Sequence, residues 1–139
     1  MKKLELEIIT PSKIGYEGKV ISITVPGSSG NFQILYNHAP IISSLEIGEI
    51  KIEESENTKL LFSTSGGTLE LSNNKIIILA ESFERSDSID VKRAEEAKTR
   101  AEMRLKNKRN EKIDEVRAEF ALKRAINRLK TANRYSLSN

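Results

Sequence analysis

The chain has 139 residues, a formal net charge of +3 and no cysteine. It can therefore form no disulfide, thiolate nucleophile or cysteine-ligated metal site, and a single histidine cannot build a histidine-rich metal site. The length fits one small domain with an appendage. His38 precedes Ala39-Pro40, a pattern that favours a turn residue over a catalytic base.

Turn residues and charge divide the chain into two parts. Every glycine and proline lies within residues 1–67. Residues 1–88 hold 8 Lys+Arg against 12 Asp+Glu, a net of −4, whereas residues 89–139 hold 15 against 8, a net of +7. The two parts sum to the +3 of the whole chain. These shifts predict two modules, at residues 1–86 and 87–139.

Residues 1–86 show the pattern of short strands. Apolar residues alternate with polar ones, or form short runs, between turn signals. The expected strands lie around residues 4–8, 21–25, 32–34, 49–53, 60–62, 69–71 and 76–79. Asn73-Asn74 is expected to form a tight hairpin turn, and the run Ile76–Leu79 to be buried on both faces. This half is therefore predicted to be an all-β, antiparallel N-terminal sandwich.

Residues 87–139 show helical periodicity twice. The first apolar stripe comprises Val91, Ala94, Ala97, Ala101 and Leu105, and the second Ala118, Leu122, Ala125, Leu129 and Ala132, flanked by Ile113, Val116, Phe120 and Ile126. Asp87, Ser88 or Asp90 could cap the first helix, and the polar break at residues 107–110 predicts a C-terminal α-helical hairpin. Alanine faces bury little area, so the hairpin is a candidate moving part. The alternative is a permanently docked hairpin with a solvated basic face.

The arginines of this hairpin have a spacing that suits an anion. Arg124 and Arg128 are i,i+4 neighbours, and Arg93 and Arg100 lie two turns apart on one face. Guanidinium groups fit phosphate oxygens, and Glu84 and Asp90 lie just upstream. The alternative is a basic helix face in solvent with ordinary i,i+4 pairs.

Several segments, in order, resemble the epsilon subunit of the bacterial F-type rotary ATP synthase. Residues 30–40 (GNFQILYNHAP) are similar to the Gly…Gly-Ile-Leu-Pro-x-His-x-Pro stretch of that family. Residues 65–71 (SGGTLEL) resemble its Ser-Gly-Gly-Phe-x-Glu-Val strand, and residues 77–81 (IILAE) its strand before the hinge. Gln33 and Tyr36 depart from the family, which usually has Gly and Pro there.

The resemblance implies a non-catalytic subunit. Its β-sandwich would lie at the foot of the central rotor and contact the gamma subunit and the c-ring. Its hairpin would either fold down or extend into the catalytic alpha/beta subunits, where it blocks ATP hydrolysis. Membrane association would come only through the complex, at the cytoplasmic face of the bacterial cell membrane.

Some bacterial members of this family carry an ATP-binding pattern, Ile/Leu-Asp-x-x-Arg-Ala, followed by two arginines on the second helix. The matching residues are Ile89, Asp90, Arg93 and Ala94, then Arg124 and Arg128, together with Glu84 and Arg100. The resemblance therefore implies ATP as a regulatory ligand, with no required cofactor and no metal site.

Two other classes of protein remain open on the sequence. A nucleic-acid-binding protein could grip phosphates with the basic hairpin, but eight acids interleave with its basic residues and few aromatics are placed for base stacking. An independent enzyme lacks a recognisable nucleophile, acid/base pair or metal set. Leu4-Glu5-Leu6-Glu7 does not fit the apolar core of a secretory signal, and residues 20–45 are too interrupted to span a bilayer.

Overall fold

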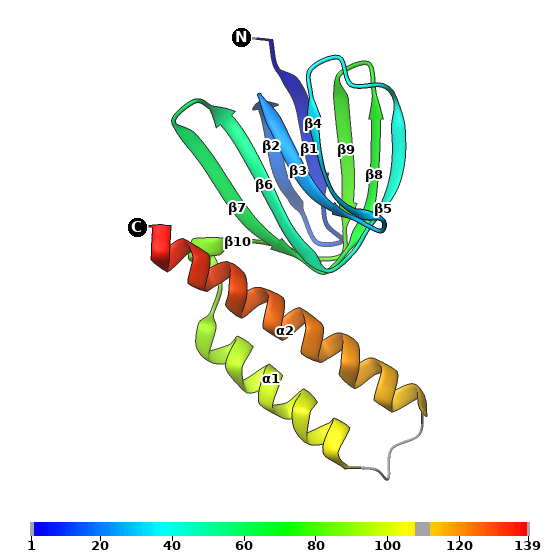
Figure 1. The fold of residues 1–139 in the computed structure, drawn as a ribbon, viewed down its shortest axis with the longest axis vertical. Helices are drawn as coiled ribbons and strands as arrows, with labels where there is room; N and C mark the ends of the chain where they lie inside the picture. Colours follow the sequence, from blue (N-terminus) through cyan, green and yellow to red (C-terminus); the bar gives the residue numbers. More distant parts are fainter. Residues whose placement is uncertain (1, 108–111, 139) are drawn as a thin grey trace. The chain divides into compact units, whose positions relative to one another are not determined.

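The computed structural model describes residues 2–107 and 112–138 (Figure 1). Strands fill the first part and two helices the second, which confirms the predicted fold class of a β-module followed by a helical hairpin. The strands are β1 (Leu4–Ile9), β2 (Ile14–Val20), β3 (Ser22–Gly27), β4 (Gly30–Leu35), β5 (Ile41–Leu45), β6 (Gly48–Ser55), β7 (Thr58–Thr64), β8 (Gly67–Ser72), β9 (Lys75–Ala80) and β10 (Phe83–Arg85). A 3₁₀ turn η1 (Ser86–Ser88) precedes the helices α1 (Val91–Lys106) and α2 (Lys112–Ser138).

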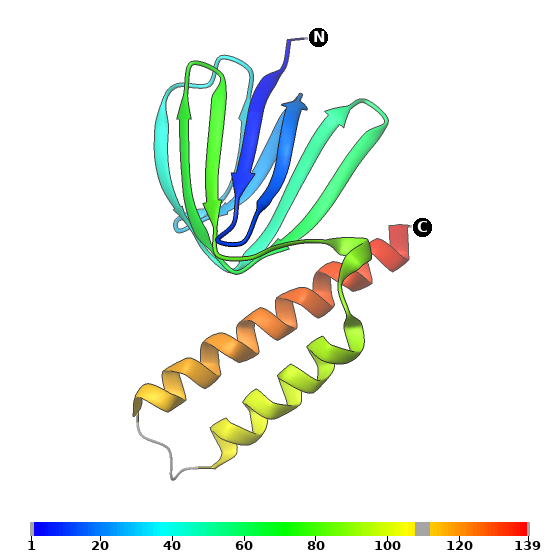
Figure 2. The same cartoon turned by 180° about the vertical axis from the view of Figure 1, so that it is seen from behind.

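The strands form one sheet in the order β10-β7-β6-β3-β5-β8-β9-β1-β2, with β4 paired to β3. The sheet folds over so that its halves enclose a common core (Figures 1 and 2). Sixteen of the described apolar residues form that core, and their alternation along the strands follows the two-residue period of a pleated sheet. A core of this size explains why the module needs no disulfide.

One pair of described strands departs from the antiparallel arrangement that the sequence predicts. β1 and β9 run parallel, with Leu6 opposite Ile76. Parallel neighbours need a long crossover, and here the crossover comprises all the strands from β2 to β8. Turn signals show where adjacent segments reverse, but they carry no information about this distant pairing.

The prediction that Ile76–Leu79 is buried on both faces is wrong. Ile76 and Ile78 are fully buried, Ile77 is half-buried, and Leu79 is 54% exposed. The strand therefore has an inner and an outer face, and the outer face carries Lys75 together with the apolar Ile77 and Leu79. The sequence also missed β2, β5 and β10, which are short or half-exposed and show no clean alternation.

Two asparagine turns are tied together at one end of the module. Asn73 and Asn74 have φ of 50° and 61°, which confirms the predicted tight hairpin between β8 and β9. Asn37 also has a positive φ, of 65°. Its backbone N–H donates to Asn74 Oδ1 at 2.6 Å, and Asn74 Nδ2 donates to Asn37 Oδ1 at 3.2 Å.

The segment around the two family departures keeps an ordinary turn. The His38 N–H donates to the Leu35 carbonyl at 3.1 Å, which confirms His38 as a turn residue. The Lys2 ammonium lies over the ring of Tyr36, with Lys2 Nζ 5.4 Å from the centroid of that ring. Gln33 is exposed on β4. Neither residue disturbs the pairing of β3 with β4.

Side chains, rather than a continuous backbone ladder, connect β2 with β6 and β7. The Tyr16 hydroxyl on β2 donates to Glu54 on β6, and its ring meets Phe62 on β7 edge-on at 6.3 Å. Phe62 stacks on Phe83 of β10 with ring centroids 4.1 Å apart. Burial raises the pKa of Tyr16 well above its usual range, and the hydrogen bond to Glu54 adds to this shift. The cluster anchors β10, the last strand of the module.

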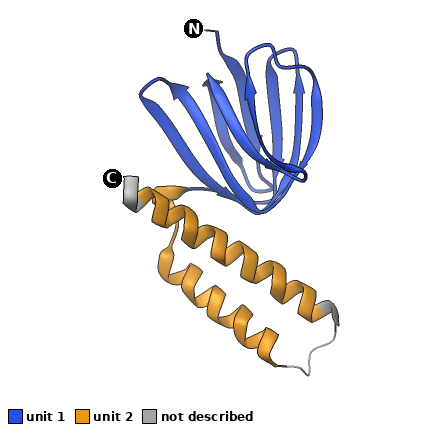
Figure 3. Cartoon of the chain, in the orientation of Figure 1, with its two compact units in different colours: residues 1–85 blue, residues 86–139 orange. Residues whose placement is uncertain are grey.

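The chain forms two compact units, residues 1–85 and residues 86–139 (Figure 3). The first is the β-module, which contains every strand. The second begins at η1 and contains both helices. Each unit is described by itself below.

We expect Gly67→Ala to destabilise the β-module strongly. Gly67 has a φ of 154°, and a Cβ there would lie 2.0 Å from the Leu79 carbonyl oxygen, so two paired strands would have to separate. Gly30→Ala is the matched control, because Gly30 also has a positive φ, of 122°, but a Cβ there meets nothing within 4 Å. Urea unfolding should show a loss of roughly 1–2 kcal/mol for the control and more than about 4 kcal/mol for Gly67→Ala. Equal losses would contradict the steric argument.

Candidate functional site

The two helices of the second unit lie side by side and antiparallel (Figures 1 and 2). Buried alanines line their contact, and we call them the alanine seam: Ala94 and Ala101 on α1, and Ala118 and Ala125 on α2. Ala132, farther along α2, is also buried. Within each helix these alanines recur every seven residues, about two turns. The predicted alanine stripes are thus confirmed as the surfaces that meet.

The other residues of the predicted stripes lie at the margins of the seam. Leu105, Leu122, Leu129 and Ala97 are half-buried, and Val91 is exposed. The expected flanking residues Val116, Phe120 and Ile126 are exposed, whereas the side chain of Ile113 and residues 108–110 of the expected break lie outside the described residues. Small residues let the helices approach closely, but they bury little apolar area.

Asp90 begins α1 as its N-cap. Its Oδ1 accepts the Arg93 N–H at 3.0 Å, and its carbonyl accepts the Ala94 N–H at 3.0 Å. Of the three expected candidates for the cap, Asp90 is therefore the one used. Ile89 is buried beside it, at 8% exposure.

Three residues of the predicted nucleotide motif thus have structural roles in the hairpin itself. Ile89 packs, Asp90 caps the helix, and Ala94 belongs to the seam. Arg93 differs, because its side chain is exposed on the first turn of α1. Within this motif Arg93 is the residue whose side chain has no packing or capping role.

The predicted arginines share one side of the hairpin. Successive helical residues are about 100° apart, so a residue directly before a seam alanine lies on one flank of its helix. Arg93 and Arg100 precede Ala94 and Ala101, and Arg124 precedes Ala125. In an antiparallel pair the corresponding flanks of both helices lie on the same side.

The sequence motif did not include every arginine on this side. Arg117 directly precedes the buried Ala118 and therefore occupies the same flank of α2 as Arg124. Arg93, Arg100, Arg117 and Arg124 are all exposed, and Arg128, one turn beyond Arg124, is half-buried. The seven-residue repeat of Arg-Ala in the sequence is the signal that could have identified Arg117.

Glu84 is the one predicted site residue in the first unit. It is half-buried on β10, opposite Ser63 of β7, between Phe83 and Arg85. The other seven residues belong to the second unit. The structure thus groups the arginines by the geometry of the hairpin, while Glu84 is held by the β-module.

The β-module has an apolar surface that the sequence did not reveal. Strand register aligns Leu79 of β9 with Ile9 of β1, and Ile9 with Ile14 of β2. The next row on this face carries Ile77 and, two strands away, Ile42. Ile14, Ile42 and Leu79 are 57%, 81% and 54% exposed. We call Ile9, Ile14, Ile42, Ile77 and Leu79 the outer apolar face.

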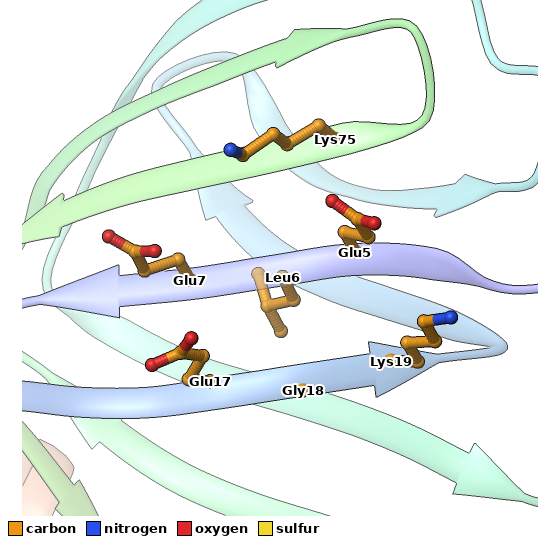
Figure 4. A pocket seen from close by; sticks show the side chains of 7 residues that line it. All are labelled: Glu5, Leu6, Glu7, Glu17, Gly18, Lys19 and Lys75. Carbon is orange, nitrogen blue, oxygen red and sulfur yellow. The ribbon is translucent and has the colours of Figure 1, made fainter.

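Charged residues border the outer apolar face. Glu7 and Glu17 lie opposite each other on β1 and β2, and Glu5 and Lys19 form the next pair. With Lys75 of β9 they line a shallow, open depression, shown in Figure 4. Alternating carboxylates and ammonium groups are typical of a solvated sheet surface, and they give this border a mixed charge.

Two further findings concern the described residues, 2–107 and 112–138. Within them, no group of three or more His, Asp or Glu residues is placed to hold a metal ion. No helix in the same residues is long and apolar enough to cross a membrane.

Two family models match the chain in succession. The beta-sandwich domain of the ATP synthase delta/epsilon chain matches residues 3–86, and the long alpha-helix domain of the same chain matches residues 87–133. The chain belongs to the ATP synthase delta/epsilon chain family. This match confirms the resemblance to the epsilon subunit that the sequence motifs indicated.

Relatives in this delta/epsilon family are similar over most of their length. The ATP synthase epsilon chain of Priestia megaterium is 42% identical over 110 residues, which are 79% of this chain and 81% of that one. The epsilon chain of Desulforamulus reducens is 41% identical over 77% of this chain and 80% of its own. That of Nitratidesulfovibrio vulgaris is 44% identical over 75% and 77%.

Two solved structures share the fold. A chain in the Euglena gracilis mitochondrial ATP synthase (OSCP/F1/c-ring) aligns with a TM-score of 0.79 at 17% identity, covering 97% of this chain and 81% of that one. A chain in the central stalk/c-ring structure of the Tetrahymena thermophila mitochondrial ATP synthase aligns with a TM-score of 0.68, also at 17% identity, covering 94% and 97%. At this identity the likeness concerns the fold.

Asp90→Ala should destabilise the start of α1. It removes the acceptor of the Arg93 N–H, an effect worth about 1 kcal/mol for an N-cap. Asp90→Asn is the matched control, because asparagine caps helices about as well while removing the charge. Hydrogen exchange of the first-turn amides of α1 should be faster in Asp90→Ala and close to wild type in Asp90→Asn. If both variants exchange equally fast, the carboxylate acts through its charge and not as a cap.

Proposed function

We propose that this chain is the epsilon subunit of a bacterial F-type ATP synthase, a non-catalytic part of the central stalk. The observation that carries this proposal is the match of both family domains, in order, over residues 3–133. The named relatives are epsilon chains, and the two similar structures come from complexes that contain a c-ring. The subunit would be peripheral, held at the cytoplasmic face of the cell membrane through the complex.

The outer apolar face supports a role for the β-module in rotor binding. Three of its members are more than half exposed: Ile42 on β5, Leu79 on β9 and Ile14 on β2, each one strand apart in the sheet order β5-β8-β9-β1-β2. A solvated sheet face normally carries polar side chains at such positions. Contiguous exposed apolar patches on small proteins mark protein contacts. The gamma subunit is the partner proposed for this face, and the c-ring the partner at the foot of the rotor.

The hairpin is proposed to regulate ATP hydrolysis. Residues 89–139 carry a net charge of +7, which suits acidic surface on the catalytic alpha/beta subunits. The seam between α1 and α2 consists of alanines, so the hairpin can rearrange at small cost. In an extended position the hairpin would block rotation in the hydrolysis direction, and folded down it would leave rotation free.

ATP is the proposed regulatory ligand of the folded-down hairpin. Arg93, Arg100 and Arg124 lie on one side of the helix pair, and guanidinium forks match phosphate oxygens. Glu84, Ile89, Asp90, Ala94 and Arg128 complete the proposed site; Ile89, Asp90 and Ala94 act by shaping the start of α1. A ligand that binds one hairpin position stabilises it by about 2.7 kcal/mol at a hundredfold excess over its Kd.

Deleting residues 89–139 should raise ATP hydrolysis by the reconstituted complex. The deletion removes the whole basic hairpin and leaves the core of the β-module intact. Steady-state hydrolysis by complexes with the full and the shortened chain measures the effect. Circular dichroism of the 1–88 fragment, which should melt cooperatively with strand signal, is the control for folding. Equal hydrolysis rates at low and high ATP would reject the inhibitory role.

Arg124→Ala should weaken ATP binding to the isolated chain. Loss of one charge-assisted contact costs roughly 1.5–3 kcal/mol, which corresponds to about ten- to a hundredfold in Kd. Lys123→Ala is the matched control, because this substitution also removes one positive charge, one residue away from Arg124. Lys123 lies on the outer side of α2, over the Phe120 ring. Titration calorimetry with ATP should show the loss in Arg124→Ala and little change in Lys123→Ala. Equal weakening by both variants would mean that only net charge matters.

A further inference from the structure

Strand β2 contains a bulge at Gly15 that turns its side chains from one face of the sheet to the other. On β1, Ile8 and Ile9 are adjacent, but their partners on β2 are Tyr16 and Ile14. Gly15 is thus an extra residue between the two partners, and a bulge of this kind re-aims the side chains around it. Ile14 is therefore 57% exposed on the outer apolar face, whereas the Tyr16 ring packs against the core.

A second bulge, on β6, directs Glu54 toward Tyr16. The residues on either side of it, Glu53 and Ser55, pair with β7, and Glu54 is the extra residue between them. Its carboxylate accepts the hydrogen bond that the Tyr16 hydroxyl donates. Because β2 ends the sheet order and β6 lies near its other end, this bond joins two distant parts of the sheet.

Phe83 of β10 packs against both β7 and β2. Its ring stacks on Phe62 of β7, with ring centroids 4.1 Å apart. A Cβ added at Gly15 would lie only 2.9 Å from Phe83 Cδ2, so the ring lies directly against the glycine backbone of β2. The Tyr16 ring meets Phe62 edge-on at 6.3 Å. Strand β2 thus holds Phe83 directly through Gly15 and indirectly through Tyr16.

The chain is firmly attached just before β10, whereas β10 itself is short. The Glu81 N–H donates to the Gly66 carbonyl at 3.0 Å, and Thr64 Oγ1 donates to the Ser82 carbonyl at 2.8 Å. β10 comprises only Phe83–Arg85, lies at the edge of the sheet and pairs with β7. The second unit begins at the next residue. So short an edge pairing opens easily unless side chains hold it.

We propose that β10 is a releasable strap, clamped by Gly15 and Tyr16 of β2, whose release lengthens the connection between the two units. Detachment of β10 leaves the attachment at Ser82 in place and adds three residues to the connection. At roughly 3.3 Å per residue this is about 10 Å of extra reach for the second unit. The Tyr16–Glu54 hydrogen bond sets how often the strap opens. The clamp lies within the β-module and operates whether or not the hairpin has a ligand.

Tyr16→Phe tests the clamp because it removes the hydroxyl and keeps the ring. Tyr36→Phe makes the same change outside the aromatic cluster and is the matched control. Hydrogen exchange in the full chain is the readout. Loss of a hydrogen bond to a carboxylate should speed exchange of the protected β10 amides about tenfold in Tyr16→Phe, while the Glu81 amide and those of β8 and β9 keep their wild-type rates. Glu54→Gln retains an acceptor oxygen, so its effect should be about threefold or less.

Two further variants address the clamp and the strap separately. Gly15→Ala forces the Phe83 ring away from β2, so exchange of the β10 amides should rise in this variant too. The pair Ser63→Cys with Glu84→Cys places two thiols directly opposite each other on β7 and β10, within the reach of a disulfide. When this pair is oxidised, adding Tyr16→Phe should no longer speed β10 exchange, and reduction should restore the effect.

The pattern of exchange along the β-module decides between a clamp and an ordinary core contact. If Tyr16→Phe speeds all β-module amides equally, Tyr16 only contributes to global stability and the strap proposal is overturned. Wild-type exchange of β10 in both Tyr16→Phe and Gly15→Ala would overturn it as well. Acceleration confined to β10, and cancelled by the disulfide, is the result expected of a releasable strap.

Discussion

The close approach of α1 and α2 along the alanine seam is the contact on which the second unit depends. Four buried alanines line this contact and each contributes a single methyl group, with half-buried leucines only at its margins. At about 25 cal/mol per Å² of buried apolar surface, such a contact is much weaker than a leucine interface of the same length. Little apolar burial therefore stabilises the pairing of α1 with α2.

The β-module is built on the opposite principle. Large aliphatic side chains such as Ile23, Ile50 and Ile78 are completely buried in a single core. The Phe62–Phe83 stack and the Tyr16–Glu54 hydrogen bond connect strands that are distant in the sequence. The first unit thus has a core of large side chains, whereas alanines line the helix contact of the second, so local opening is expected to cost less in the second unit.

Most of the fold could be predicted from local patterns. Turn chemistry at Asn73-Asn74 and the seven-residue spacing of alanines are both local properties, and the structure agrees with each. The parallel pairing of β1 with β9 is a long-range property that no turn signal encodes. For the same reason the outer apolar face was not predicted, because Ile14 and Ile42 join Leu79 only through strand register.

The sequence predicted the candidate ATP site as one motif. In the structure, some residues of that motif pack or cap the start of α1, whereas its arginines lie on one edge of the hairpin. Ile89, Asp90 and Ala94 pack and cap the start of α1, roles that the hairpin needs with or without a ligand, so their presence alone carries little information about a ligand. The information lies in the arginines, which precede seam alanines on both helices and thereby gather on one edge. A basic helix in plain solvent gains nothing from placing like charges across a weak seam. The placement of these arginines on one edge is therefore the feature of the hairpin on which the proposed ATP site depends.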